Sequence, residues 1–271
     1  MKIKNNEDLL LSYMSKAPLA LAFERYLECR LYRDLDMAGP VLDMGCGEGL
    51  FAHILFEEKI DTGIDPNAYE LERARQLNGY KELIDCKGDA VPKPSGAYKT
   101  IISNSVLEHI PDLSPVFKEI YRLLAPGGRF YMTVPAPEFE HYTIGNVVLT
   151  FIGLHQWAQK YRTFCSQVLW KQVHYKSVEG WKKFAQEHGF SVEEVFSYDP
   201  KGICLMNDFL YPFSILAVII KRLTNRWVLF PRIRSVLLYP LYMIARIILN
   251  RDIRTDKGGL VFLSLKKGDS I

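Results

Sequence analysis

Residues 41–50 decide the fold of this chain, and they read Val-Leu-Asp-Met-Gly-Cys-Gly-Glu-Gly-Leu. An apolar run that follows Pro40 stops at a glycine-rich turn, and residues 51–56 then continue with the apolar spacing of a helix. This order predicts a strand, a loop and a helix. Glycine lets the backbone approach a ligand closely, and the free N–H groups at a helix start point toward it. The segment therefore predicts a loop that binds a nucleotide-like molecule.

The spacing of the glycines excludes two common nucleotide loops. A dinucleotide fingerprint would place its third glycine at position 50, which is Leu50, and a P-loop would end in Gly-Lys-Ser/Thr. The pattern resembles motif I of the class I S-adenosylmethionine (SAM) dependent methyltransferases. This resemblance implies an α/β fold, a Rossmann-like sheet of seven strands with helices on both faces, and SAM as the cofactor. It also implies cofactor contacts from Asp43, Gly45, Cys46, Gly47 and Gly49.

The acid at position 65 suits the ribose of such a cofactor. Residues 59–66 predict a second short strand that ends in Asp65 and Pro66, and Asp65 lies 22 residues after Asp43. A βαβ unit delivers a carboxylate to ribose hydroxyls at about this distance, and one carboxylate accepts two hydroxyl hydrogen bonds. The alternative is a helix cap, because Asp-Pro often begins a helix and residues 67–77 have a helical pattern. Beside motif I, ribose binding is the favoured prediction.

Further cofactor contacts are expected after the next two strands. Residues 83–90 predict a third strand that ends in Gly-Asp-Ala. In the family that the chain resembles, an acid here accepts a hydrogen bond from the adenine amino group and a neighbouring N–H completes the recognition, which implies roles for Asp89 and Ala90. Residues 98–103 predict the fourth strand, and Asn104 follows at its carboxyl end, where ligands bind in open α/β sheets.

Residues 104–112, Asn-Ser-Val-Leu-Glu-His-Ile-Pro-Asp, also resemble the segment after this strand in small-molecule methyltransferases. His109 in this segment is a candidate general base, and a histidine that caps or packs at a helix end is the alternative. Residues 113–124 predict an amphipathic helix that Ala-Pro-Gly-Gly ends at 125–128, and residues 129–135 predict the fifth strand. Helix, Pro-Gly-Gly and strand in this order recur in the same superfamily.

Residues 136–176 interrupt the alternation of strands and helices and are rich in aromatic and histidine side chains. An insertion after the fifth strand lies over the carboxyl edge of the sheet, so this segment is predicted to form the wall or lid of the substrate site. His141 and His174 are candidate general bases, because imidazole takes up a proton near neutral pH. The alternative for each is a histidine satisfied in the core or at the surface.

The C-terminal part completes the predicted sheet. Residues 177–188 predict a capped helix that ends at Gly189, residues 190–198 predict a sixth strand, and residues 258–266 predict a seventh. In the family that the chain resembles, the last two strands form a hairpin with a short connection. Here residues 201–251 separate them, which predicts a long insert.

The insert at 201–251 is both apolar and basic. Residues 210–220 and 236–249 are strongly apolar, but both fall short of the ~20 residues that a membrane-spanning helix needs, and each contains a proline. They predict buried or interfacial helices. The insert holds eight Lys and Arg residues and one acid, a net charge of +7, which leaves −4 for the rest of the chain out of a total of +3.

Charge and aromatic placement favour a membrane surface for this insert. Apolar helices flanked by Lys and Arg, with Trp and Tyr at their edges, match a peripheral surface that faces an anionic membrane. Two alternatives stay open, a homodimer interface and a hydrophobic cap over a bulky substrate. A nucleic-acid partner is not expected, because the basic residues alternate with aliphatic runs rather than polar ones.

The N-terminal segment at 7–37 has helical spacing that breaks at Ala17-Pro18, so it predicts a helical cover on the sheet or a lid over the cofactor mouth. The predicted organisation has four parts, namely an N-terminal cover at 1–37, a SAM-binding core at 38–135, a substrate lid at 136–176, and the C-terminal part of the core with its basic insert at 177–271.

Composition sets further bounds. A chain of 271 residues with 48% hydrophobic content can bury one substantial core, which fits a compact enzyme and not a disordered adaptor. The five cysteines are scattered without a C-x-x-C pair, so neither a disulfide framework nor a zinc site is expected, and a reducing compartment is. Residues 1–8 lack an apolar signal core. We therefore expect a cytoplasmic protein, peripheral on the inner face of the membrane, without a bound metal.

The resemblance implies transfer of a methyl group from the sulfonium of SAM to a nucleophile. Catalysis then needs positioning and, for a hydroxyl acceptor, a base. Methyltransferases of nucleic-acid and protein amino groups carry an Asn/Asp-Pro-Pro-Tyr/Phe motif after the fourth strand, whereas residues 103–106 read Ser-Asn-Ser-Val. We therefore expect an oxygen or nitrogen of a small hydrophobic, lipid or lipid-linked acceptor.

Two alternative functions stay open. The first is a soluble methyltransferase of a natural product or sugar, whose inserts serve dimerisation or form a pocket lid. The second is a scaffold that binds SAM without catalysis, which the intact glycines of motif I disfavour.

Overall fold

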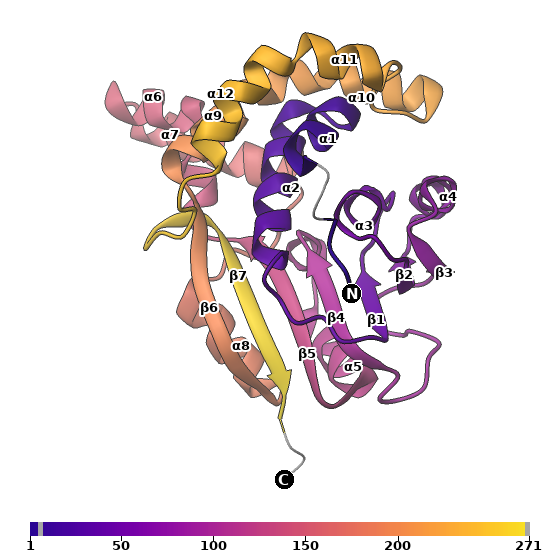
Figure 1. Cartoon of the computed structure of the whole chain (residues 1–271). Helices are drawn as coiled ribbons and strands as arrows, with labels where there is room; N and C mark the ends of the chain where they lie inside the picture. Colours follow the sequence, from indigo (N-terminus) through magenta and orange to yellow (C-terminus); the bar gives the residue numbers. More distant parts are fainter. Residues whose placement is uncertain (5–7, 269–271) are drawn as a thin grey trace.

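A central sheet of seven strands organises the chain, as a computed structural model shows for residues 1–4 and 8–268 (Figure 1). The strand order is β3-β2-β1-β4-β5-β7-β6. All neighbouring pairs are parallel except those that β7 makes with β5 and β6. The strands are β1 (Val41–Met44), β2 (Ile60–Asp65), β3 (Tyr80–Asp85), β4 (Tyr98–Asn104), β5 (Leu124–Pro135), β6 (Phe190–Pro200) and β7 (Gly258–Lys267). This confirms the predicted seven-stranded, Rossmann-like α/β fold.

Helices cover both faces of the sheet because neighbouring residues of a strand point to opposite faces. Phe130 of β5 packs in one hydrophobic cluster with Phe117 and Trp181, and the next residue, Tyr131, packs in the other with Tyr32. The core helices are α3 (Leu50–Leu55), α4 (Ala68–Leu77), α5 (Leu113–Leu123) and α8 (Val178–Glu187), with the short helix η1 (Leu107–His109) after β4.

Two helices occupy the N-terminal segment for which the sequence predicted a cover or a lid. Helix α1 (Leu9–Lys16) is capped by Asp8, whose side chain accepts from the Leu11 N–H, and Pro18 separates it from α2 (Leu19–Tyr32). Both helices bury apolar side chains in the same cluster as α3, although α2 ends before the predicted boundary at 37. Residue 7, where the helical pattern begins, lies outside the described residues.

The two inserts are helical and lie at the same end of the molecule (Figure 1). The lid segment holds η2 (Phe139–His141), α6 (Ile144–Phe151), α7 (His155–Phe164) and η3 (Cys165–Leu169). The basic insert holds α9 (Lys201–Leu210), η4 (Tyr211–Phe213), α10 (Ser214–Thr224), α11 (Pro231–Leu237) and α12 (Tyr239–Leu249). Since β6 pairs with β7 from Phe190 and Lys267 to Pro200 and Gly258, the basic insert is the connection of a long hairpin.

Two predicted strand boundaries were wrong. The third strand ends at Asp85 and not at 90, because its partner β2 ends at Asp65 and Pro66 has no N–H to continue the ladder. The segment at 125–128 belongs to β5, because a register shift between Tyr98 and Thr100 accommodates the additional residues.

The first apolar stretch of the basic insert is longer than predicted. Helices α9, η4 and α10 form one continuous run, Lys201–Thr224, of 24 residues. By length and composition alone this run could cross a membrane, and most of its apolar surface is not buried in the protein. The second stretch is divided between α11 and α12, which both remain shorter than a membrane span.

Candidate functional site

The glycine-rich loop lies between β1 and α3, as predicted. A side chain at Gly45 would meet the Val106 side chain at 2.5 Å, so this glycine lets the loop pack against the end of β4. Gly47 has φ +52°, and a Cβ there would meet nothing within 4 Å. Open space beside Gly47 is what a ligand held against the backbone requires.

A pocket surrounds this loop, and we call it the loop pocket. Its walls come from the loop itself, from the start of α3, from α1 and α2, and from the end of β4. Six of the ten predicted cofactor residues line it, namely Asp43, Gly45, Cys46, Gly47, Gly49 and Asn104. The other charged lining residues are Arg25, Glu48 and Glu70.

Asp43 forms the buried floor of the loop pocket. Its Oδ2 accepts a 2.6 Å hydrogen bond from the Tyr80 hydroxyl. Burial raises the pKa of this carboxyl to about 7, against the opposing effect of the Tyr80 hydrogen bond. Asp43 therefore titrates near neutral pH.

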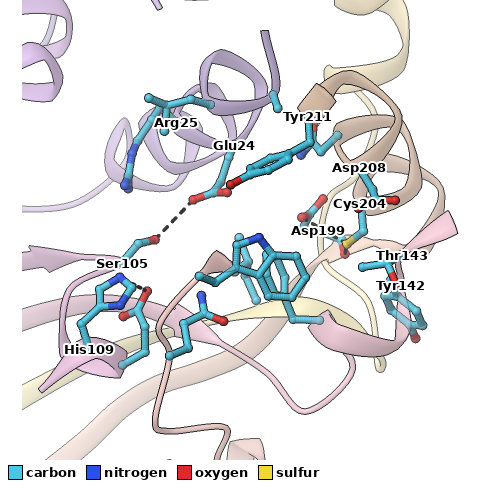
Figure 2. A pocket seen from close by; sticks show the side chains of 18 residues that line it. Glu24, Arg25, Ser105, His109, Tyr142, Thr143, Asp199, Cys204, Asp208 and Tyr211 are labelled. Atoms are coloured by element: carbon cyan, nitrogen blue, oxygen red, sulfur yellow. Dashed lines mark hydrogen bonds and ion pairs between the residues drawn. The ribbon is translucent and has the colours of Figure 1, made fainter. Parts of the chain in front are cut away.

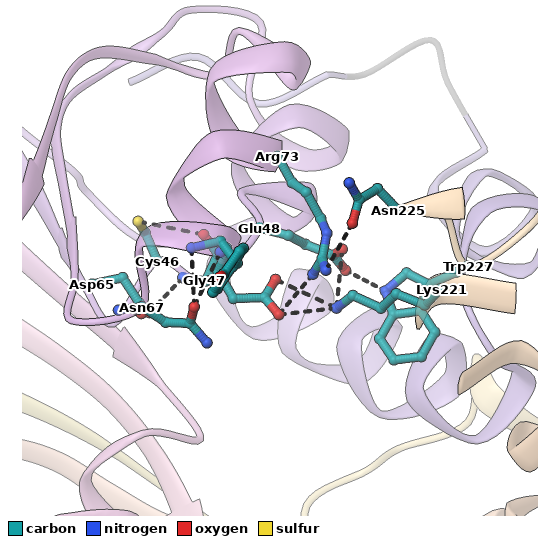
Figure 3. Close-up of polar contacts among 11 residues, drawn as sticks. Cys46, Gly47, Glu48, Asp65, Asn67, Arg73, Lys221, Asn225 and Trp227 are labelled. Carbon is teal, nitrogen blue, oxygen red and sulfur yellow. Dashed lines mark hydrogen bonds and ion pairs between the residues drawn. The ribbon is translucent and has the colours of Figure 1, made fainter. Parts of the chain in front are cut away.

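Asp65 lies behind the loop and holds its shape. Its carboxylate accepts the backbone N–H groups of Gly47 at 3.0 Å and Asn67 at 2.8 Å (Figure 3). The helix cap is Asn67, not Asp65, since the Asn67 side chain accepts from the first N–H groups of α4. Neither Asp65 nor Pro66 is on the lining of the loop pocket, and its ribose role stays a prediction.

Asp89 and Ala90 are exposed in the turn after β3 and do not line the loop pocket. Because β3 ends at Asp85, the chain leaves the sheet five residues earlier than the sequence suggested, and it carries both residues outward. Their adenine role stays a prediction.

Two side chains of the basic insert, Lys221 and Trp227, contact residues that line the loop pocket, and we call this pair the clasp. The Trp227 indole donates a 2.5 Å hydrogen bond to Glu48, and the Lys221 ammonium lies 3.4 Å from Glu48 and 3.2 Å from Glu70 (Figure 3). The Lys221 ammonium also lies 4.0 Å from the centroid of the Trp227 ring. The clasp thus joins α10 and its following loop to residues that line the loop pocket.

A second cavity of about 240 Å³ adjoins the loop pocket, and we call it the acidic cavity. Leu21, Arg25 and Ser105 line both spaces, so the two are neighbours across α2 and the end of β4. Four carboxylic acids line the acidic cavity, namely Glu24, Glu108, Asp199 and Asp208. Figure 2 labels Glu24, Asp199 and Asp208.

Among the described residues, Arg25 is the only Lys or Arg on the acidic cavity's lining, and its charge is already matched by a buried acid. Its guanidinium lies 2.6 Å from the carboxylate of Glu28, which has no exposed surface. Glu28 also accepts the hydroxyls of Ser105 and Thr133, each at 3.0 Å. The cavity therefore has a surplus of negative or acidic groups.

Comparison with known proteins identifies the family. Residues 15–195, more than half of the chain, match the family model described as methyltransferase domain. The chain belongs to this methyltransferase family.

Individual relatives align with a shorter part of the methyltransferase than the family model does. A ubiquinone biosynthesis O-methyltransferase of Pectobacterium carotovorum is 34% identical over 104 residues, which are 35% of this chain and 42% of the relative. A sterol 24-C-methyltransferase of Pneumocystis carinii is 37% identical over 98 residues, which are 33% of this chain and 26% of the relative. The chain thus spans less than half the length of these relatives.

A solved structure aligns with most of the methyltransferase chain. The phosphoethanolamine N-methyltransferase 2 of Haemonchus contortus, in complex with SAM, aligns with a TM-score of 0.54 at 18% identity, over 93% of this chain and 54% of that one. The class I fold is therefore shown, and SAM is the cofactor of the methyltransferase.

The loop pocket fits this cofactor chemically. SAM carries two positive groups and one carboxylate in its methionine part, and the pocket offers Asp43, Glu48 and Glu70 beside the guanidinium of Arg25. The open space at Gly47 admits a ligand against the loop backbone. These residues are our candidates for holding the cofactor.

Of the three candidate histidines of the methyltransferase, only His109 lines the acidic cavity. Its Nδ1 lies 3.2 Å from the Lys171 carbonyl oxygen, which can only accept, so Nδ1 carries a proton and Nε2 faces Glu108 at 3.7 Å. His109 stays a candidate base.

His141 and His174 lie outside the acidic cavity. His141 is half exposed and borders a separate surface hollow beside α6 and α7. The Nε2 of His174 lies 2.9 Å from the Ile110 carbonyl and 3.2 Å from the Pro111 carbonyl, so it donates to the backbone. The sequence could not separate these roles, because the fold and not the spacing decides which histidine faces the cavity.

Sequence reasoning missed the charged residues of α2. Glu24, Arg25, Glu28 and Arg30 interrupt a mostly apolar helix, and charges in a buried helix are a signal of a site or of an ion pair. It also missed Asp199, the residue before the last one of β6, which has a left-handed conformation at φ +64°. Glu108 was noted within a family motif but received no role.

Proposed function

We propose that this methyltransferase transfers the methyl group of SAM to an oxygen or nitrogen of a lipophilic acceptor at a membrane surface. One observation carries the proposal. The acidic cavity adjoins the loop pocket, and residues of α9 and η4 form one of its walls. The same helical run continues into α10, whose apolar side chains are exposed. An acceptor could thus pass from an apolar surface to the cavity along one element.

Exposed large apolar side chains concentrate in the two inserts. In the described part of the chain, every large apolar side chain that is exposed, apart from Tyr69, lies within residues 144–173 or 209–247. Phe151, Leu223 and Val236 are 89%, 80% and 74% exposed. Soluble monomers rarely expose such a concentration of apolar surface, so a second apolar phase is expected to cover it.

Charge favours an anionic membrane as that phase. The basic insert carries eight Lys and Arg residues and one acid. Basic residues beside an apolar helical surface bind the anionic headgroups of the cytoplasmic leaflet. The five free cysteines are compatible with that reducing side of the membrane. A homodimer through the same surface is the alternative that the test below separates.

The names of the relatives support a lipophilic acceptor. One relative is a ubiquinone biosynthesis O-methyltransferase and another is a sterol 24-C-methyltransferase, and ubiquinone and sterols are lipids. From these relatives we infer only the chemical class of the acceptor for this chain, because the chain covers less than half of either relative.

The chemistry of the site follows from its own residues. SAM, when bound, supplies an electrophilic methyl group. The loop pocket excludes water around it with Leu21, Leu50 and Phe51, which lie on its lining. The acidic cavity orients the acceptor, and His109 or a carboxyl of the cavity accepts the proton that the acceptor loses.

Turnover on membrane lipids tests the proposal. The protein is incubated with methyl-labelled SAM and a total lipid extract, presented either in vesicles with anionic lipid or in neutral detergent. We expect label in an extractable lipid and faster labelling on the anionic vesicles. SAM binding by calorimetry without label in any lipid would overturn the lipid proposal and favour a soluble acceptor or a scaffold. A dimer by analytical ultracentrifugation with no vesicle dependence would assign the apolar surface to a second copy.

A further inference from the structure

The acidic cavity has unmet hydrogen-bond acceptors. Glu108 and Asp199 are each 1% exposed, and Glu108 Oε2 and Asp199 Oδ1 have no hydrogen-bond partner. The side-chain oxygen of Asn207, on the same lining, is also without one. A buried oxygen without a donor destabilises the protein, so a ligand that supplies donors is favoured at this place.

The three residues come from separate parts of the fold and line one space. Glu108 lies in η1 after β4, Asp199 lies at the end of β6, and Asn207 lies on α9. Figure 2 shows Glu24 and Asp199 on opposite sides of this space, with Asp208 beyond Asp199. A ligand in the middle therefore meets acceptors from several directions.

Aromatic rings complete the wall. Phe139, Trp170 and Tyr211 line the cavity, and the rings of Phe139 and Trp170 lie 4.9 Å apart between centroids. Aromatic faces attract ammonium groups, and they also accommodate an apolar chain attached to one. Carboxylates and aromatic rings together are the surroundings that a substituted ammonium prefers.

A metal ion does not account for the acids. Among residues 1–4 and 8–268, the structure contains no group of three or more His, Cys, Asp and Glu side chains close enough to hold one. The acids surround the space instead of converging on one point, which suits an organic cation.

We propose that the acidic cavity binds the amine of a lipophilic acceptor as its ammonium form, which makes the chain an N-methyltransferase of an amphiphilic amine. This inference rests on the proposed function, and it narrows that function from oxygen or nitrogen to nitrogen. The ammonium donates to Glu108, Asp199 and Asn207, while its apolar chain leaves past Tyr211 toward α10.

The proton balance follows from the cavity's own groups. An ammonium has no lone pair, so it first gives one proton to a carboxylate of the cavity. The freed lone pair then forms the N–C bond, the C–S bond breaks, and its electron pair stays on sulfur. Each transfer releases one proton to solvent through that carboxyl. Burial raises the pKa of Glu108 to about 8 and that of Asp199 to about 7, which suits a proton acceptor near neutral pH.

Binding of two matched probes tests the inference without turnover. Calorimetry compares n-octylamine with 1-octanol, which has the same chain and no charge, in the absence of SAM. We expect octylamine to bind at least about tenfold more tightly. Equal binding of both probes, or tighter binding of octanol, would overturn the inference.

Variants locate the binding. Glu108→Gln and Asp199→Asn keep the size of each side chain and remove its charge, and each should weaken octylamine binding about tenfold with little change for octanol. The matched control is Glu187→Gln on α8, an exposed acid away from the cavity. Circular dichroism spectra show whether each variant folds, and a folded variant with unchanged octylamine affinity contradicts the assignment.

The pH dependence adds a second readout. Octylamine remains protonated up to about pH 9, so its affinity should increase from pH 6 to pH 9 as Glu108 and Asp199 ionise. In the Glu108→Gln variant this increase should be smaller. The other titratable or charged groups that face the cavity are Glu24, Arg25, His109, Tyr142, Cys204, Asp208 and Tyr211.

The two proposals can fail separately. If the lipid extract is labelled on a neutral lipid and octylamine does not bind, the lipid function stands and the amine inference falls. If octylamine binds as expected and no lipid is labelled, the cavity is an amine site and the acceptor is not a membrane lipid.

Discussion

At the scale of single residues, three buried carboxyls define the site. Burial raises the pKa of Asp43 and Asp199 to about 7 and that of Glu108 to about 8. Asp43 lies on the loop pocket and the other two on the acidic cavity. Ordinary folding does not place several acids in the interior, because each loses its hydration. Such groups concentrate at functional sites, where a ligand compensates the loss.

The stability of the SAM-free protein should depend on pH through Asp43. A carboxyl whose pKa is higher in the folded state stabilises the folded protein, and this contribution is fully present below the unfolded pKa of 3.8. The contribution is lost as the pH rises through the folded pKa of about 7. Asparagine imitates the protonated form. We therefore expect Asp43→Asn to gain at least about 1 kcal/mol in unfolding free energy, relative to the wild type, between about pH 5 and pH 8.5.

Urea unfolding at the two pH values measures this difference. Asp34→Asn is the control, because Asp34 is an exposed aspartate and its replacement should give the same difference at both pH values. If the Asp43→Asn difference is also independent of pH, the raised pKa of Asp43 is refuted.

At the scale of elements, the clasp connects the basic insert with the cofactor loop. Lys221 is 14% exposed and lies within 3.4 Å of Glu48 and Glu70, both of which line the loop pocket. Arg73 extends the contact with a 3.4 Å hydrogen bond to Asn225. Since α10 also carries exposed apolar side chains, one element touches the predicted cofactor site and the predicted membrane surface.

Loss of the clasp should loosen the loop that follows α10. Lys221→Met keeps the aliphatic stem and removes both ion pairs, which are largely shielded from water. We expect amide hydrogen exchange in residues 225–230 to become about five- to tenfold faster, with unchanged exchange in β1 and β4.

The neighbouring residue provides the control for this experiment. Arg222 belongs to the same helix and is exposed, so Arg222→Met removes one charge at the same end of α10 without touching Glu48. Equal exchange in the two variants would mean that the clasp does not hold this loop.

At the scale of the whole molecule, the site elements gather at one end of the sheet. The glycine loop, Asn104, η1 and the lid segment follow the carboxyl ends of β1, β4 and β5, and the basic insert connects β6 to β7 at the same end (Figure 1). Parallel strands place their carboxyl ends together, so segments distant in sequence meet there. The apolar helices thus stand beside the two cavities.

The whole protein should bind anionic vesicles in a salt-dependent way. In flotation experiments we expect binding at low salt and a loss of most of it at about 0.5 M salt, where charges are screened beyond a few ångströms. Replacing Ile233 and Leu237 of α11 together by Ser should also reduce binding several-fold, because these side chains are 59% and 74% exposed and lie four residues apart on one helix face.

Tyr69→Ser is the matched control, since Tyr69 is 81% exposed on α4 and lies outside both inserts. It should leave vesicle binding unchanged. Equal losses in the two variants, or binding that is insensitive to salt, would speak against a peripheral membrane surface at α11.

The sequence by itself determined the class of the protein. The spacing of Gly45, Gly47 and Gly49 depends on local backbone geometry, and so does the alternation of apolar strands and amphipathic helices, so both are legible along the chain. Together with the resemblance of motif I to class I methyltransferases, they predicted the sheet of seven strands, the family and the cofactor. Net charge predicted the unusual character of the insert at 201–251, because composition does not depend on folding.

Only the tertiary structure decided which side chains share a space. It placed Glu24, Glu108 and Asp199, which are far apart in the sequence, around one cavity, and it placed His141 and His174 elsewhere. It placed Asp89 in an exposed turn, because the pairing of β3 with β2 ends at Asp85 and Asp65. Contacts of this kind result from strand order, register and helix packing, which bring distant residues together. No local sequence pattern predicts them.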